Sequence, residues 1–156
     1  MRTAPRTHPN SAAKAWGVHA GTFLEMGDEM KYVVETQKSV NQAEADLCAA
    51  VQRHKFGVLH IHDLQETMKK KGVDFENACR ILEICNPKSA KEVLTADMDM
   101  NFALPCRVSV YSDHGKTKIG MIKPAAMLKS LSDSPVLARV AEEVEESMIK
   151  IIEEAK

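Results

Sequence analysis

A chain of 156 residues has the usual length of one domain and can bury a core without metals or disulfides. The formal net charge of −1 and the aromatic content of 4% exclude a basic groove or a stacking platform for nucleic acid. No apolar run reaches the roughly 18 residues of a membrane-spanning helix, and the four cysteines lack C-x-x-C spacing. We therefore expect reduced thiols in a cytoplasmic protein, with neither a nucleic-acid nor a membrane partner.

Residues 1–29 differ in composition from the rest of the chain. The first 24 residues contain no Asp or Glu, and prolines interrupt any hydrophobic periodicity. Two interpretations stay open: a flexible extension, or a misassigned start codon with translation beginning at Met30. A transit peptide would share the acid-poor composition. We expect one α+β domain over residues 30–156.

The first predicted elements are a strand and a helix. Residues 32–35 are β-branched or aromatic apart from the last, which is typical of a strand. Ser39 and Gln42 have the spacing of a capping box and predict the start of a helix, which apolar residues at helical spacing continue. We expect Gly57 to end this helix in the left-handed conformation that glycine adopts freely.

A second strand and a short helix follow. Residues 58–62 alternate in the manner of a strand, and Asp63 with Glu66 forms a second capping box. Three lysines followed by Gly72 are typical of a helix C-terminus.

The middle of the chain predicts three more strands. Residues 81–85 form the third strand, and Asn86 before a proline begins a helix. Residues 106–111 and 117–122 are apolar strands, and the polar segment 112–116 between them predicts a hairpin loop. The acidic segment around Asp97 lacks the ligand count of a calcium site and is expected to be a solvated loop.

The C-terminal part of the chain is helical. Pro124 begins a short helix, and Ser134 with Pro135 begins a long one, in which a wide apolar stripe from Leu137 to Ala155 opposes a run of glutamates. Hairpin-linked strands mixed with helices predict an α+β fold: a mostly antiparallel sheet with helices packed on one face.

Four short motifs lie where a strand meets a turn or a helix: FGVLHIHD at 56–63, Cys85-Asn86-Pro87, Leu104-Pro105-Cys106 and Ile122-Lys123-Pro124. With these motifs in this order, the chain from about Met30 onward resembles the bacterial and archaeal family known as domain of unknown function 302. The resemblance implies a curved, mostly antiparallel sheet with helices on one face, similar to a TATA-box-binding-protein half-domain, and a homodimer. It implies no reaction, because the family has no established shared one.

Two histidines are the first candidates for a binding site. His60 and His62 are two residues apart on a strand, so they share one face, while Leu59 and Ile61 face the helices. Two imidazoles on one face are ligands for a transition metal when a third ligand comes from elsewhere. The resemblance does not supply this site, because many family members have other residues there. The alternative is a hydrogen-bonded pair on a polar or dimer-facing surface.

Two charged residues interrupt the apolar strands. Glu83 and Arg107 lie in mid-strand, where an unpaired buried charge is costly. A cross-strand ion pair on the exposed face explains them. They are also candidates, with His60 and His62, to line a pocket for an anion or a metal.

Two cysteines lie at strand ends beside prolines. By strand parity Cys85 falls on the open face and Cys106 on the core face, which argues against a shared metal or a disulfide. Cys85 lies just before a helix N-terminus, where the helix dipole lowers a thiol pKa. It is therefore the candidate nucleophile, the alternative being that both thiols are small hydrophobic core residues.

These observations favour a soluble homodimeric binding module over an enzyme. We expect a small ligand, a transition metal or a metal-bearing cofactor on the open sheet face near His60 and His62. A thiol-dependent enzyme that uses Cys85, with a histidine as base, is the alternative from another class, and a purely structural interaction protein is the third.

Overall fold

The computed structural model describes residues 29–156, so the expectations for the preceding segment lie outside the described residues. Five antiparallel strands form an open sheet in the order β1-β5-β4-β3-β2. The strands are β1 (Lys31–Thr36), β2 (Gly57–Asp63), β3 (Cys79–Cys85), β4 (Cys106–Asp113) and β5 (Lys116–Ile122). The helices are α2 (Val40–Arg53), α3 (Leu64–Lys70), α4 (Pro87–Ala96), α5 (Pro124–Leu131) and α6 (Pro135–Ala155), with a 3-10 helix η2 (Met98–Ala103). The predicted α+β fold is confirmed.

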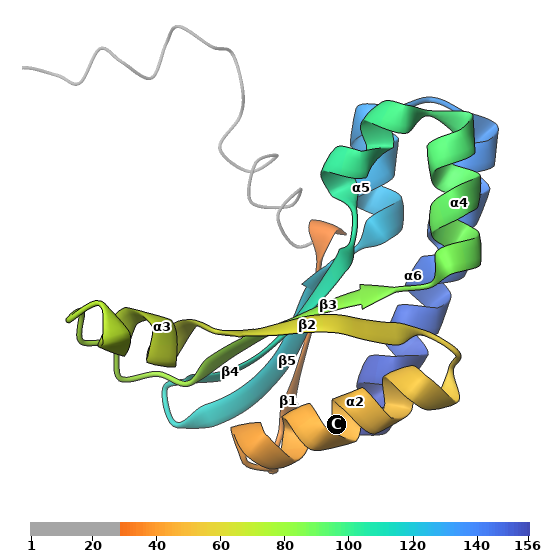
Figure 1. Cartoon of the computed structure of the whole chain (residues 1–156). Helices are drawn as coiled ribbons and strands as arrows, with labels where there is room; N and C mark the ends of the chain where they lie inside the picture. The colour runs from red at the N-terminus through yellow and green to blue at the C-terminus, as the bar shows by residue number, and fades with distance from the viewer. Residues whose placement is uncertain (1–28) are drawn as a thin grey trace, which may run out of the picture.

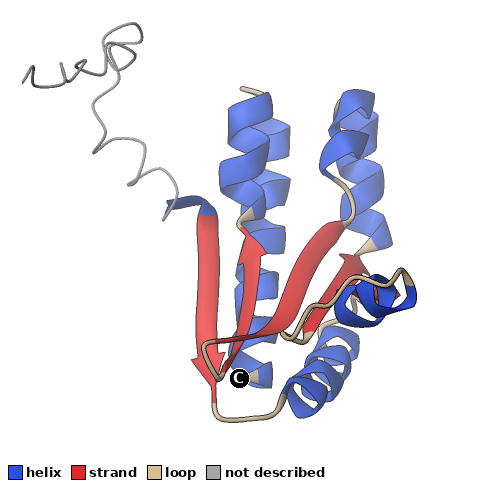
Figure 2. Ribbon diagram, turned by 90° about the vertical axis from the view of Figure 1, so that its left-hand side faces the viewer, coloured by secondary structure: helices blue, strands red, loops and turns tan. Residues whose placement is uncertain are grey.

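The helices divide into two groups. Figure 1 shows α2 and the C-terminal part of α6 on one side of the sheet, while α4 and α5 stand beside the N-terminal part of α6, beyond one end of the strands. In Figure 2 some helices rise beyond the upper ends of the strands, and others lie near their lower ends. The other side of the sheet has no helix across it among the described residues, and we call it the open face.

The main core lies between the sheet and the pair α2 and α6. Alternate residues of the central strands point into it and are fully buried, namely Leu82, Ile84, Val108, Val110 and Ile119. A second, smaller core joins η2, α4 and α5 to the first half of α6, through residues such as Met100, Leu128 and Leu137. No helix among residues 29–156 has the length and apolar character needed to cross a membrane.

Three of the predicted helix caps are present. The side chain of Ser39 accepts a hydrogen bond from the backbone N–H of Gln42 at 3.2 Å, and that of Asp63 accepts one from Glu66 at 2.9 Å. Asn86 caps α4 by accepting from two backbone N–H groups. Ser134 precedes α6 as expected, but its side chain makes no cap hydrogen bond.

Two turns differ from their predictions. Helix α2 ends before Gly57, which begins β2, and the left-handed residue between them is Lys55, with φ of 61°. The hairpin between β4 and β5 is tighter than the predicted five-residue loop. Only His114 and Gly115 connect the strands, with φ of 48° and 76°, as in a type I′ turn whose twist matches that of the sheet.

A β-bulge in β2 changes which residues face the core. Val58 pairs with Ile84 and His60 pairs with Glu83, so Leu59 is an extra residue opposite no partner. Leu59 is 62% exposed, whereas Val58 packs against the main core. The prediction that Leu59 faces the helices is therefore wrong, because strict alternation fails at a bulge. The prediction for Ile61, which packs against the core, is confirmed.

The predicted loop around Asp97 is instead a short helix. Asp97 Oδ1 accepts a hydrogen bond from the backbone N–H of Asp99 at 3.0 Å and caps η2. The carboxylate thus has a structural role, and η2 carries Phe102 to the end of the open face.

Candidate functional site on the open sheet face

The open face carries both charged and apolar side chains. The register places His60 opposite Glu83, and Glu83 opposite Arg107. The neighbouring row runs from His62 in β2 to Ser109 in β4 and Gly120 in β5. The β2–β3 side of the two rows carries both histidines and Glu83, and the side beyond Arg107 carries small or apolar residues, so the face has two chemically distinct halves.

The four predicted ligand residues form one polar cluster. The rings of His60 and His62 lie edge to face, with centroids 4.4 Å apart. Nε2 of His62 donates a hydrogen bond to Oε1 of Glu83 at 3.0 Å, and the Arg107 guanidinium lies 3.9 Å from the same oxygen. The sequence patterns thus placed on one face residues that the sheet brings into contact.

Glu83 is the electrostatic centre of this cluster. Its side chain is 21% exposed, while that of Arg107 is 66% exposed. The hydrogen bond from His62 is the main cause that lowers the pKa of Glu83, and the charges of His62, Arg107 and His60 lower it further. The carboxylate is therefore held ionised by one hydrogen-bond donor and by the nearby guanidinium.

The cluster does not form a metal site within one chain. No group of three or more His, Cys, Asp or Glu residues that could hold a metal ion occurs between residues 29 and 156. The two histidines supply two metal ligands, and Oε1 of Glu83 already accepts a hydrogen bond from His62. A catalytic zinc site needs three protein ligands, so a third ligand for these imidazoles has to come from outside this arrangement.

An apolar groove of about 460 Å³ occupies the other half of the open face. Its floor includes Ser109 and Gly120, and the segment from Phe102 to Pro105 closes one end. Phe102 is 82% exposed, which is unusual for so large an apolar side chain. No sequence pattern indicated this groove, because its walls come from β1, β3, β4, β5, η2 and the segments that follow η2 and β5.

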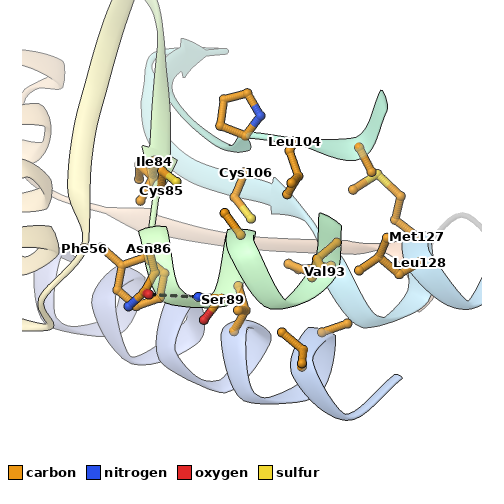
Figure 3. Close-up of a pocket in the computed structure, with 17 residues that line it drawn as sticks. Phe56, Ile84, Cys85, Asn86, Ser89, Val93, Leu104, Cys106, Met127 and Leu128 are labelled. Atoms are coloured by element: carbon orange, nitrogen blue, oxygen red, sulfur yellow. Dashed lines mark hydrogen bonds between the residues drawn. The ribbon is translucent and has the colours of Figure 1, made fainter. Parts of the chain in front are cut away.

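A smaller cavity of about 40 Å³ lies behind the same segment, between the end of the sheet and the helices α4, α5 and α6. Figure 3 shows Cys85 and Cys106, from neighbouring strands, in its wall, together with Phe56 and Leu128. The prediction that the two thiols have opposite strand parity agrees with the burial pattern of β3 and β4. They nevertheless line one cavity, because β3 ends and β4 begins beside it.

Burial raises the pKa of both thiols. It raises the pKa of the Cys85 thiol above its usual value of 9.0. Burial also raises the pKa of Cys106 to about 11, with a smaller contribution from the neighbouring Cys85. The expected position of Cys85 before α4 is confirmed, and burial acts against the predicted lowering of its pKa.

Comparison with known proteins agrees with the motif resemblance. The family model described as "Domain of unknown function DUF302" matches residues 32–155. A crystal structure of an uncharacterized conserved protein DUF302 from Bacillus stearothermophilus is similar, with a TM-score of 0.77 and 32% sequence identity. The match covers 81% of this chain and 98% of that chain. No curated protein matches the chain.

Proposed function

We propose that this chain, which belongs to the DUF302 family, is a homodimeric binding module that holds a small ligand on the open face of its sheet. The observation that carries the proposal is the hydrogen-bonded cluster of His60, His62, Glu83 and Arg107 beside an apolar groove on the same face. Small-molecule sites typically combine an apolar surface with a few convergent polar groups.

The exposed apolar residues of the open face support the dimer. Val33 is 47% exposed, Ile122 is 55% exposed and Phe102 is 82% exposed, and all three line the groove. Contiguous exposed apolar surface marks an interaction site more often than it marks free surface. A second copy that contacts the outer parts of these side chains would enclose the groove and leave the space between them for a ligand.

The polar cluster supports an anionic ligand, with a transition metal or a metal-bearing cofactor as the alternative. Arg107 is the permanent cation of the cluster and its side chain is 66% exposed, and a guanidinium binds carboxylates and phosphates through paired hydrogen bonds. A metal would need a further ligand, such as one from the second copy, because residues 29–156 of one chain offer too few. Titration of zinc and copper into the wild type and into His60→Ala/His62→Ala separates these ligands, since identical isotherms would exclude a metal here.

No observation favours the thiol-dependent enzyme. Burial raises the pKa of Cys85, which lowers the thiolate fraction on which nucleophilic attack depends. The third hypothesis, a purely structural interaction protein, predicts no bound ligand.

The dimer is tested by one pair of matched variants. Ile122 and Leu131 are 55% and 54% exposed, but only Ile122 lies on the open face, while Leu131 ends α5. Light scattering at tens of micromolar should report a dimer for the wild type and for Leu131→Glu, and a monomer for Ile122→Glu. A monomeric wild type, or a dimer that survives Ile122→Glu, would remove the proposal.

A further inference from the structure

The groove on the open face has a charge pattern of its own. Of the described residues that line it, Lys31 and Arg107 are cationic, and none is Asp or Glu. The whole chain has a net charge of −1, so a sizeable surface with two cations and no acid departs from the average of the molecule. A groove of this kind is electrostatically complementary to an anion.

The two cations lie at the same end of the groove. Lys31 pairs with Ile122, and the neighbouring pair is Met121 with Val108. By the same antiparallel register Ile122 stands between Lys31 and Arg107, and the side chains of all three point away from the core. Both cations can therefore reach one acid group placed above Ile122.

Arg107 keeps hydrogen-bonding capacity for such a group. The closest carboxylate oxygen in its ion pair belongs to Glu83, at 3.9 Å, beyond hydrogen-bond distance. That oxygen already accepts a hydrogen bond from His62 at 3.0 Å. A planar guanidinium that is 66% exposed can then present its paired N–H groups to a carboxylate.

The rest of the groove is apolar and of suitable size. Val33, Ile81 and Leu104 contribute to its walls, and the exposed ring of Phe102 lies at its edge. Its volume of about 460 Å³ falls within the range of about 300–1,000 Å³ that small-molecule sites occupy. The hydroxyls of Ser109 and Tyr111 are the polar groups on this part of the lining.

We propose that the groove binds an amphipathic carboxylate, with its acid group between Lys31 and Arg107 and its aliphatic or aromatic body over Ser109 and Gly120, against Val33 and Ile81. The inference rests on the proposed function, because it names the class of ligand that the open face binds. It places the ligand in the groove, with Arg107 as the residue shared with the polar cluster.

The test uses probes that differ only in their head group. Calorimetric titration of the full chain, below micellar concentrations, compares decanoate with decanol and decylammonium. Decanoate should bind at least about tenfold more tightly than decanol, because a charge-assisted hydrogen bond is lost with the acid. Decylammonium should not bind. Equal affinities for decanoate and decanol would overturn the proposed role of the cations.

Two variants locate the probe. Arg107→Gln should weaken decanoate binding about tenfold, while Lys88→Gln, an exposed lysine on α4, should leave it unchanged. Ser109→Phe should abolish binding by filling the groove floor, since the side chain of Ser109 points away from the core. Retention of wild-type affinity by Ser109→Phe, with its fold verified by circular dichroism, would place the ligand elsewhere and overturn the inference.

Assembly is measured in the same samples and separates the two proposals. If the chain is dimeric but binds no decanoate, the carboxylate proposal is wrong and the dimer proposal stands, as expected if the second copy fills the groove. A monomer that binds decanoate contradicts the dimer and supports the groove.

Discussion

The two faces of the sheet use neighbouring residues of the same strands for different purposes. In β3, Leu82 and Ile84 are fully buried under α2 and α6, whereas Ile81 and Glu83 are part of the open face. No polar or charged residue is buried among residues 29–156. The covered face therefore supplies stability through apolar burial, and the open face can carry charges and exposed apolar groups without a large folding cost.

The largest expected effect is the contrast between Leu82 and Ile81. Leu82→Ala should lower the free energy of unfolding by about 2–5 kcal/mol, because it leaves a cavity in the main core. Ile81→Ala should lower it by less than about 1.5 kcal/mol, since Ile81 is only partly buried. Urea denaturation monitored by circular dichroism measures both. Equal losses would mean that the open face contributes to stability as the covered face does.

The bulge at Leu59 gives a second contrast between adjacent residues. Val58→Asp should cost about 2 kcal/mol or more, because it places a carboxylate against the main core. Leu59→Asp should change stability by less than about 0.5 kcal/mol, because Leu59 is 62% exposed. The same denaturation measurements apply. A larger cost at Leu59 than at Val58 would show that β2 continues without the bulge.

The thiols extend the comparison to reactivity. The pKa of Cys106 rises from 9.0 to about 11, so at neutral pH its thiolate fraction should be about a hundredfold below that of an unperturbed thiol. Alkylation with iodoacetamide, followed by mass spectrometry, should therefore modify Cys85 before Cys106. Faster modification of Cys106 would contradict the burial that raises its pKa.

The same shift predicts a loss of stability at alkaline pH. The folded-state pKa of Cys106 is raised above the unfolded value of 9.0, so the contribution of this thiol to the free energy of unfolding is fully present below pH 9.0. This contribution is lost as the pH rises through about 11. Cys106→Ala should show a smaller fall in melting temperature over this interval than the wild type. An identical fall in both proteins would show that the thiol does not contribute.

The smallest expected effect lies within the polar cluster. The hydrogen bond from His62 lowers the pKa of Glu83 below 4.5. The contribution of the Glu83 carboxylate to stability is therefore present above pH 4.5 and is lost as the pH falls through the pKa of Glu83 in the folded protein. The melting temperature of Glu83→Gln should be slightly below that of the wild type at neutral pH, and the difference should vanish in acid. The effect is small because exposed ion pairs contribute little. A difference that persists well below pH 4.5 would contradict the assigned hydrogen bond.

Local signals in the sequence predicted the helix caps and several residues of the open face. The caps at Ser39, Asp63 and Asn86 depend on residues three or fewer positions away, so the sequence contains all of their information. Strand alternation placed His60, Glu83 and Arg107 on one face for the same reason.

Features that depend on distant segments were not predictable in this way. The bulge at Leu59 is defined by the partner strand β3, and strict alternation therefore failed there. Helix α2 ended earlier than glycine placement suggested, because Lys55 adopts the left-handed conformation itself. The groove, including Phe102, joins segments that are far apart in the sequence, so no single stretch of sequence indicates it.

The central claim is that the open face is the surface on which a second copy and a small ligand bind. Native mass spectrometry of the purified full chain tests it most directly, because one spectrum reports assembly and bound mass together. The account predicts a wild-type dimer that carries added mass, and an Ile122→Glu variant that is monomeric. A wild-type monomer at the mass of the bare chain would contradict it.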